Sequence, residues 1–219
     1  MKIGICACQF YQRVPAAAWS AVAAACRQSG RDYEIIPDLC YLAAKDPAAL
    51  QRFEVLLSCQ VRAVRALAAA GSSAAVKCYD LQTVSVPQLL QELGLESPAD
   101  VPEQTSYAAL PQDWVPWFPV LDAERCVHCG KCADFCLFGV YTRENGKVKV
   151  VAPENCKTNC PACARMCPHN AIIFPKSPEP RLNGSLPDAC PPSQDEKASL
   201  AELLQRRKAK MQLFREDRE

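Results

Sequence analysis

The stretch CVHCGKCADFC at residues 126–136 holds four cysteines, and CKTNCPACARMC at residues 156–167 holds four more. The first run has the spacing C-x2-C-x2-C-x3-C, and the second has C-x3-C-x2-C-x3-C followed by Pro168. Two residues between cysteines let a tight loop wrap around a metal centre and turn its backbone N–H groups toward the sulfur atoms. The spacing therefore predicts that these cysteines are metal ligands and that they decide the fold of this region.

The two runs resemble those of bacterial ferredoxins that carry two [4Fe–4S] clusters, in which the fourth cysteine of each run binds the other cluster. The resemblance implies a first cluster held by Cys126, Cys129, Cys132 and Cys167. It implies a second cluster held by Cys156, Cys160, Cys163 and Cys136. Structural zinc is the alternative, because paired C-x2-C units also bind that ion.

The chain between and after the runs supports the same fold. GVYTRENGKVKVVAPENC at residues 139–156 predicts a hairpin with Asn145-Gly146 at its turn, and AIIFP at 171–175 predicts a closing strand. Two features depart from the family pattern. Leu137 stands where proline often follows the first run, and Thr158 or Asn159 is an inserted residue in the second. We expect the inserted residue to bulge the loop without loss of a ligand.

The N-terminal part alternates short apolar strands with helices. We expect strands at residues 2–8, 33–40, 53–59 and 74–80, and helices at 15–30, 46–53, 60–71 and 86–95. This alternation indicates a parallel sheet with right-handed crossovers. With the usual strand order 2-1-3-4, the first three strands are neighbours about 4.8 Å apart.

Cysteines recur where these strands end. Cys6 and Cys8 end the first strand, Cys40 the second and Cys59 the third, and Cys78 lies near the end of the fourth. The carboxyl ends of parallel strands share one edge of the sheet, where open α/β sheets bind their ligands. We therefore infer a third redox site, a [4Fe–4S] cluster held by four of these cysteines, with Cys6, Cys8, Cys40 and Cys59 as the candidate set.

Two alternatives remain for these N-terminal cysteines. One is a dithiol/disulfide pair, such as Cys6 with Cys8 or with Cys40, that acts by exchange. The other is that reduced cysteines pack as small hydrophobic residues.

The same segment is similar to the N-terminal domain of the flavin-binding subunit of heterodisulfide reductase. The shared features are C-x-C at the end of the first strand, a cysteine after the second, and LLSCQVRAV at residues 56–64. By this match Cys59 and Arg62 fall on the family's cysteine and arginine, and Arg62 could hold an anion, lie near a cluster or be a plain surface residue. That family carries its flavin-binding domain before its ferredoxin repeats, but no G-x-G-x-x-G follows a strand here, so neither flavin nor NAD is expected.

Composition sets the class of the protein. The chain has 219 residues, 15 cysteines, 22% charged residues and a formal net charge of +1. A net charge close to zero gives no reason to expect nucleic-acid binding. The sequence contains no apolar run of about 18 residues that would predict a membrane span. The odd number of cysteines and an N-terminal strand in place of an export signal favour reduced thiols in the cytoplasm.

The predicted fold class is α/β plus α+β. We expect a small flavodoxin- or Rossmann-like parallel-sheet domain at residues 1–82 and a connector at 83–118, with Trp114, Trp117 and Phe118 as packing anchors. A two-cluster ferredoxin-like domain at 119–176 follows, and then an irregular Pro-rich segment and a C-terminal helix at 177–219.

These features predict an electron-transfer component rather than an enzyme with its own catalytic residues. Its partners would be an electron donor and an acceptor, with heterodisulfide-reductase-like or flavoprotein subunits as candidates. One alternative is a reductase component that acts on a disulfide or sulfur species at the N-terminal cysteines. The other is an iron–sulfur assembly or scaffold protein.

Overall fold

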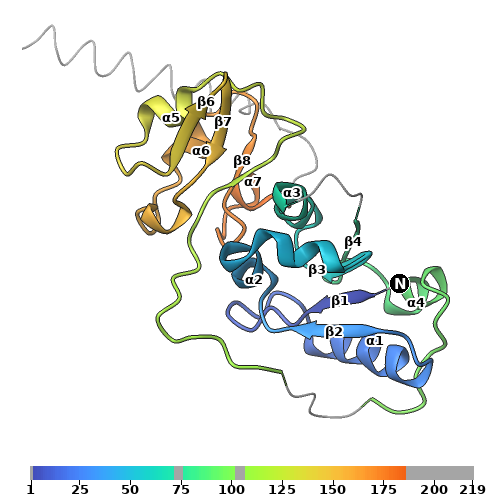
Figure 1. The fold of residues 1–219 in the computed structure, drawn as a ribbon. Helices are drawn as coiled ribbons and strands as arrows, with labels where there is room; N and C mark the ends of the chain where they lie inside the picture. Colours follow the sequence, from blue (N-terminus) through green and yellow to red (C-terminus); the bar gives the residue numbers. More distant parts are fainter. Residues whose placement is uncertain (1, 72–75, 102–106, 186–219) are drawn as a thin grey trace, which may run out of the picture. The chain divides into compact units, whose positions relative to one another are not determined.

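The structure is a computed structural model that describes residues 2–71, 76–101 and 107–185. Residues Met1–Pro187 belong to one compact unit (Figure 1). Within it, we call residues 2–101 the α/β half and residues 119–185 the cysteine-rich half. The predicted C-terminal helix and Cys190 lie outside the described residues.

The α/β half is built on a four-stranded parallel sheet. Its strands are β1 (Ile3–Cys6), β2 (Tyr33–Ile36), β3 (Val55–Ser58) and β4 (Lys77–Asp80). Their order is β2-β1-β3-β4, which confirms the predicted order. The strands are fully buried at the centre, where Ile5 pairs with Ile35 on one side and Leu57 on the other.

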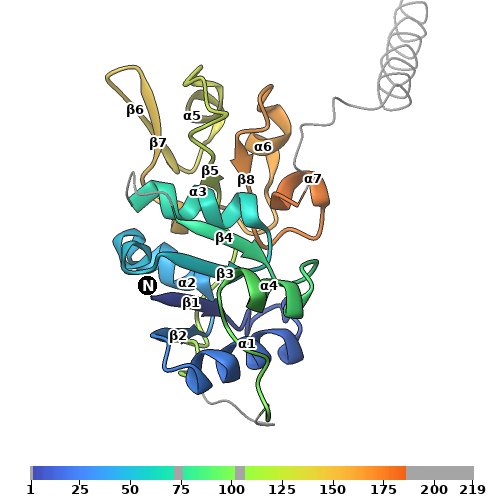
Figure 2. The same cartoon turned by 90° about the vertical axis from the view of Figure 1, so that its right-hand side faces the viewer.

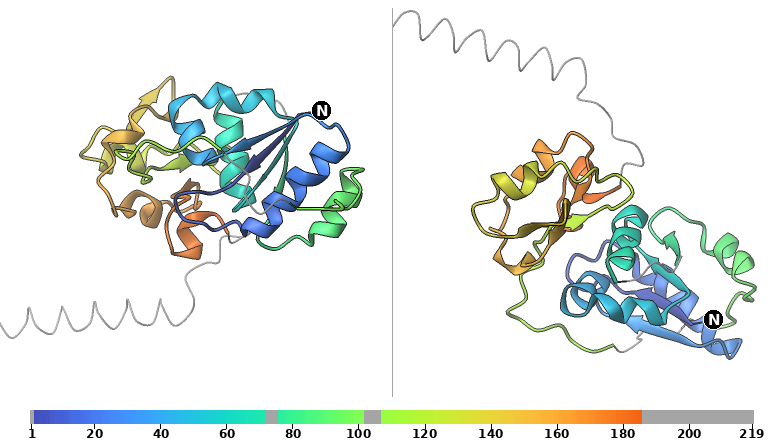
Figure 3. Two further views of the ribbon diagram at one scale, coloured as in Figure 1. Left: turned by 90° about the horizontal axis from the view of Figure 1, so that it is seen from below. Right: turned by 45° about the horizontal axis from the view of Figure 1, so that its top comes forward.

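Helices cover both faces of this sheet. They are α1 (Ala16–Gln28), α2 (Leu39–Lys45), the 3-10 helix η1 (Pro47–Arg52), α3 (Val61–Gly71) and α4 (Val86–Glu92). Helices α1 and α4 lie together on one face, and α2, η1 and α3 lie together on the other (Figure 2 and Figure 3). This division follows from right-handed crossovers, because the chain passes from β1 outward to β2 and then back across the sheet to β3.

The second predicted strand was too long. Strand β2 ends at Ile36, and Asp38 begins a helix instead, because its side chain accepts the backbone N–H groups of Cys40 and Tyr41. Cys40 therefore lies in the first turn of α2 and not at a strand end. The predicted helix at 46–53 is a 3-10 helix that Asp46 caps.

The cysteine-rich half consists of short elements. They are β5 (Val120–Leu121), α5 (Lys131–Phe135), β6 (Tyr141–Glu144), β7 (Lys147–Val150), the 3-10 helix η2 (Pro153–Asn155), α6 (Ala162–Met166), β8 (Ile172–Ile173) and α7 (Pro180–Asn183). The β6–β7 hairpin is confirmed: Asn145 and Gly146 have φ of 50° and 74°, as a type I′ turn requires.

Two features of this half differ from the prediction. The closing strand β8 is confirmed, but its antiparallel partner is β5, a strand too short to show an alternating pattern. Helix α7 lies in the Pro-rich segment that we expected to be irregular.

The connector's aromatic residues pack on both halves. Trp117 stacks on Phe174 with ring centroids 4.9 Å apart, and Phe118 joins the core of the α/β half. Trp114 lies edge-on against Tyr41, with centroids 5.2 Å apart. These contacts give all three residues the anchoring position that the sequence suggested.

Across the described segments, we find no helix with the length and apolar character needed to cross a membrane.

Gly4 provides a test of the packing in the sheet. A Cβ atom added at Gly4 would lie 2.8 Å from Leu56 Cδ2 and 3.0 Å from Phe53 Cδ1. We expect Gly4→Ala to lower the free energy of unfolding by about 1–3 kcal/mol, because an overpacked core must shift. Chemical denaturation measures this, with Lys77→Ala at an exposed position of β4 as the control. Equal stability of the Gly4 variant and the wild type would contradict the packing.

Candidate functional site

A first cavity in the cysteine-rich half gathers cysteines from both runs. Its lining includes Cys126, Cys129, Cys132 and Cys167, and Cys163 also reaches its wall. The loop before α5 turns tightly, because His128 and Gly130 have φ of 55° and 86°. The structure thus brings together the first three cysteines of one run and the last cysteine of the other.

A second cavity gathers the complementary set. Its lining includes Cys136, Cys156, Cys160 and Cys163, beside the apolar side chains of Phe135, Leu137, Phe138 and Val140. The inserted residue of the second run bulges as expected: Asn159 has φ of 60°, while Cys160 remains on the cavity wall.

Both cavities carry hydrogen-bond donors directed at sulfur. The backbone N–H of Ala171 donates to Cys167 Sγ at 3.3 Å, and the Tyr141 hydroxyl donates to Cys163 Sγ at 3.1 Å. Burial raises the pKa of Cys163, and the Tyr141 hydroxyl opposes that rise. Donors in these positions suit sulfur atoms that carry negative charge.

Trp117 supplies a further donor. Its buried Nε1 forms no regular hydrogen bond with the described residues, yet its N–H lies near Cys156. Burial raises the pKa of Cys156 to about 12, and the indole N–H opposes this rise. A buried donor without a regular partner beside Cys156 fits a sulfur atom that carries negative charge.

His128 lies between the first cavity and the hairpin. Its Nδ1 accepts the backbone N–H of Val148 at 3.1 Å and lies 3.6 Å from Cys126 Sγ. Because Nδ1 accepts, the ring proton lies on Nε2 in the neutral imidazole. His169 lines the same cavity.

Four of the five cysteines predicted at the strand ends come together in the α/β half. We call Cys6, Cys8, Cys40 and Cys59 the N-terminal thiol site; their exposed fractions are 3%, 1%, 4% and 5%. Cys6 ends β1, Cys8 follows it with φ of 49°, Cys59 follows β3, and Cys40 comes from α2. The backbone N–H of Leu39 donates to Cys6 Sγ at 3.4 Å.

Two of these thiols are directly paired. Hydrogen bonding from Cys59 lowers the pKa of Cys8, against the effect of burial. The same bond and burial raise the pKa of Cys59. Burial also raises the pKa of Cys6, and it raises that of Cys40 to about 12.

Cys78 does not belong to this site. It is the second residue of β4, which begins at Lys77, and it pairs with Leu56 in the middle of β3. Its Sγ lies 3.7 Å from the carbonyl oxygen of Val76. The predicted fourth strand ends at Asp80, as observed, but the residue level with the end of β3 is Asp80, which pairs with Ser58, and Cys78 lies two residues before it.

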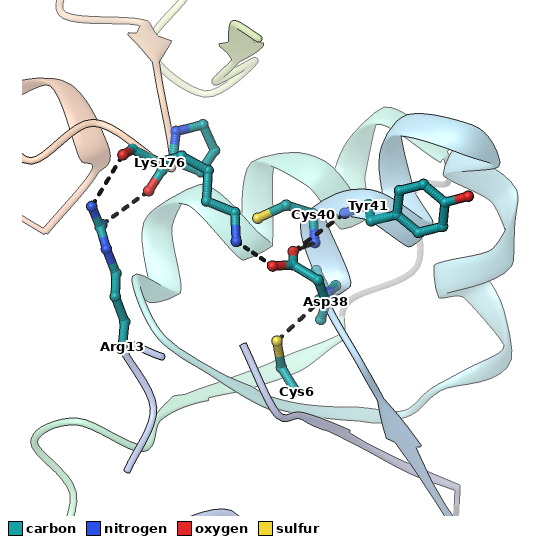
Figure 4. A network of polar contacts seen from close by, with 8 residues as sticks. Cys6, Arg13, Asp38, Cys40, Tyr41 and Lys176 are labelled. Carbon is teal, nitrogen blue, oxygen red and sulfur yellow. Dashed lines mark hydrogen bonds and ion pairs between the residues drawn. The ribbon is translucent and has the colours of Figure 1, made fainter. Parts of the chain in front are cut away.

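Charged residues that the sequence analysis missed surround the N-terminal thiol site (Figure 4). Lys176 Nζ lies 2.5 Å from Asp38 Oδ2, and both side chains are buried. Arg13 donates to the carbonyl oxygens of Pro175, Lys176 and Ser177 at 3.0, 3.2 and 2.7 Å. In the sequence, the position of Asp38 directly before LCYLAAK could have identified it as a helix cap. Nothing in the sequence marked Lys176 as a buried residue.

Arg62 joins the two halves instead of holding a free anion. Its Nε donates to Asp122 Oδ2 at 2.8 Å, and its Nη2 donates to the carbonyl oxygen of Asn170. Asp122 caps the turn before Cys126 by accepting the backbone N–H of Glu124. Arg62 therefore positions the loop that begins the first cavity.

Among the described cysteine, histidine, aspartate and glutamate residues, no three lie in an arrangement that would hold one metal ion. An iron–sulfur cube makes a different demand, since each thiolate binds its own iron and the four ligands stand further apart.

Comparison with known proteins bears on the cysteine-rich half. Residues 118–169 match the family described as the 4Fe-4S dicluster domain. An uncharacterized ferredoxin of Methanocaldococcus jannaschii is 51% identical over 70 residues, which are 32% of this chain and 48% of that protein. The chain thus spans about half the length of that relative.

Two further relatives are covered over more of their length. Ferredoxin-3 of a Nostoc species is 38% identical in an alignment of 76 positions, and the match covers 26% of this chain and 77% of that protein. Pyruvate synthase subunit PorD of M. jannaschii is 42% identical over 60 residues, which are 27% of this chain and 67% of that protein. Through its cysteine-rich half, this chain belongs to the ferredoxin family with a 4Fe-4S dicluster domain.

Proposed function

We propose that this chain is an iron–sulfur electron-transfer protein that relays single electrons between a donor protein and an acceptor protein. The observation that carries the proposal is the pair of cavities, each lined by one crossed set of four cysteines. The first set is Cys126, Cys129, Cys132 and Cys167. The second set is Cys156, Cys160, Cys163 and Cys136.

The residues of this half hold and tune the clusters. A bound [4Fe–4S] cluster supplies a one-electron couple, so that each relay takes one electron from a reduced donor and gives one to an oxidised acceptor. The hydroxyl of Tyr141 and the backbone N–H of Ala171 stabilise negative charge on the ligand sulfurs. Apolar side chains of the second cavity lie beside the sulfurs of its four cysteines.

We extend the proposal to a third redox site, a [4Fe–4S] cluster held by Cys6, Cys8, Cys40 and Cys59. The four buried thiols converge from three different elements of the α/β half, and the backbone N–H of Leu39 donates to the first of them. The buried ammonium of Lys176 adds positive charge beside them. The ammonium and the N–H donor offset part of the cost of holding thiolates in a buried site.

The hydrogen bond between Cys59 and Cys8 favours one second candidate, a redox dithiol. In that case the two thiols would give two electrons and two protons to a substrate disulfide, which would leave as two thiols while a Cys8–Cys59 bond forms. The candidate dithiol is then Cys8 with Cys59, and not Cys6 with Cys8 or Cys40, the pairs that the sequence suggested. Exposed fractions of 1% and 5% leave the two sulfurs little access to a substrate, so we favour the cluster.

Similarity to a protein named as a pyruvate synthase subunit supports a place within a larger oxidoreductase. We propose that the chain serves as an electron-carrying component for another subunit. Heterodisulfide-reductase-like and flavoprotein subunits remain candidate partners.

The cofactor content tests the proposal directly. We expect anaerobically purified full-length protein to contain about twelve irons and about twelve acid-labile sulfides, because each cube carries four of each. Iron and sulfide assays with electron paramagnetic resonance measure this. About eight of each would limit the protein to the two crossed sets, and a colourless protein with zinc would contradict the whole proposal.

Two cysteine variants test the third site independently of the dicluster domain. We expect Cys59→Ser to reduce the iron content from about twelve to about eight per chain, since a cube that loses a thiolate ligand is released. Cys78→Ser is the matched control, because Cys78 lies outside the N-terminal thiol site. If both variants keep all their iron, Cys59 is not a ligand.

Tyr141 tests the tuning of the second cluster. Tyr141→Phe removes the hydrogen bond to Cys163 Sγ, and that bond favours the more negative, reduced state. We expect one of the two dicluster potentials to fall by about 20–60 mV, from a bond of about 0.5–1.5 kcal/mol. Spectroelectrochemistry measures the two potentials. Tyr107→Phe is the control, because the ring of Tyr107 packs on Trp19. A shift of both potentials, or of neither, would count against this role.

A further inference from the structure

Lys176 is a buried cation beside the N-terminal thiol site. It follows β8 in the cysteine-rich half, and its side chain is 3% exposed. Its Nζ lies 2.5 Å from the Oδ2 atom of Asp38, whose side chain is fully buried at the start of α2 (Figure 4). The chain thus inserts an ammonium group from one half into the other.

The surroundings of this ammonium exclude water and fix its position. The rings of Tyr11 and Trp114 lie with their centroids 5.5 and 5.8 Å from Nζ. Arg13 holds the backbone on both sides of the lysine through the carbonyl oxygens of residues 175–177. A charge held in this way acts on its neighbours with little screening.

Its neighbours are the thiols of the N-terminal site. Figure 4 shows Nζ, the Asp38 carboxylate and Cys40 Sγ gathered at the beginning of α2. The Asp38 carboxylate that binds Nζ also accepts the backbone N–H of Cys40 at 3.0 Å, and the next N–H in the chain before it, that of Leu39, donates to Cys6 Sγ at 3.4 Å. The charge of Lys176 therefore lies beside the start of α2, which contacts two of the four proposed ligands.

We propose that Lys176 sets the reduction potential of the N-terminal thiol site. A fixed positive charge stabilises the reduced state more than the oxidised state, because reduction adds one negative charge. Asp38 acts on the same site with the opposite sign. The inference rests on the third redox site of the proposed function.

The lysine and the thiols it acts on come from different halves of the molecule. The thiols belong to the α/β half, while the lysine comes from the segment that follows the last strand of the cysteine-rich half. The N-terminal thiol site therefore has its working potential only while the two halves remain joined at Lys176.

The test is a redox titration of the anaerobic full-length protein, followed by electron paramagnetic resonance. The component that disappears in Cys59→Ser is assigned to the N-terminal thiol site. For Lys176→Met we expect the reduced fraction of that component to fall at least tenfold at a given potential, which is about 59 mV for a one-electron couple. The dicluster components should keep their potentials.

A double-mutant cycle of Lys176 and Asp38 distinguishes an effect on the reduction potential from damage to the fold. Asp38→Asn keeps a side chain that can cap α2 and should shift the same component in the opposite direction, while the double variant should return toward the wild type. Lys176→Arg keeps the charge and should stay near the wild type. Lys149→Met, at a side chain that is 58% exposed, should shift nothing.

Each outcome either supports or overturns the proposed role of Lys176. Shifts of opposite sign that cancel in the double variant support the proposal. An unchanged potential in Lys176→Met, or shifts of the same sign in both single variants, overturns the role of Lys176 and leaves the third site standing. If Cys59→Ser loses no component and no iron, the third site and the role of Lys176 both fail, while the dicluster proposal stands.

Discussion

The buried ion pair between Lys176 and Asp38 links two parts of the chain that are 138 residues apart. Removing one partner of such a pair leaves an uncompensated charge in a water-poor interior and costs about 3–5 kcal/mol. Arg13 and Arg62 work beside it: the first holds the segment that carries Lys176, and the second binds Asp122 at the entrance to the first cysteine run. Cationic side chains from three places thus hold the cysteine-rich half against the sheet that bears the N-terminal thiols.

Local pattern was enough to predict much of the architecture. Alternating apolar strands and helices gave the sheet with its order β2-β1-β3-β4, and the Asn145-Gly146 turn gave the β6–β7 hairpin. The hairpin could be predicted because its signal lies within a few residues. The crossed cysteine sets, which line two separate cavities, join two separate runs, and it was the resemblance to ferredoxins that implied them.

The errors have equally local causes. Cys40 was assigned to a strand end because YEIIPDLC reads as extended chain, whereas the Asp38 side chain starts a helix within it. Cys78 was assigned to the sheet's edge although its register places it beside Leu56 in the middle of β3, and register cannot be read from one strand alone. No pattern could place Lys176, since its partner is distant in sequence and a single lysine near a proline suggests a surface loop. The burial of that ammonium arises only from the packing of the two halves.

The unequal exposure of the cysteines also decides how the protein ages in air. Cys129 is exposed, whereas the thiols of the N-terminal site are between 1% and 5% exposed. Oxygen and peroxide attack sulfur that they can reach, and oxidation beyond sulfenic acid is difficult to reverse. Oxidation will therefore begin at Cys129 and reach the N-terminal thiols last, so a sample already damaged at the first cavity can still hold reduced thiols in the α/β half.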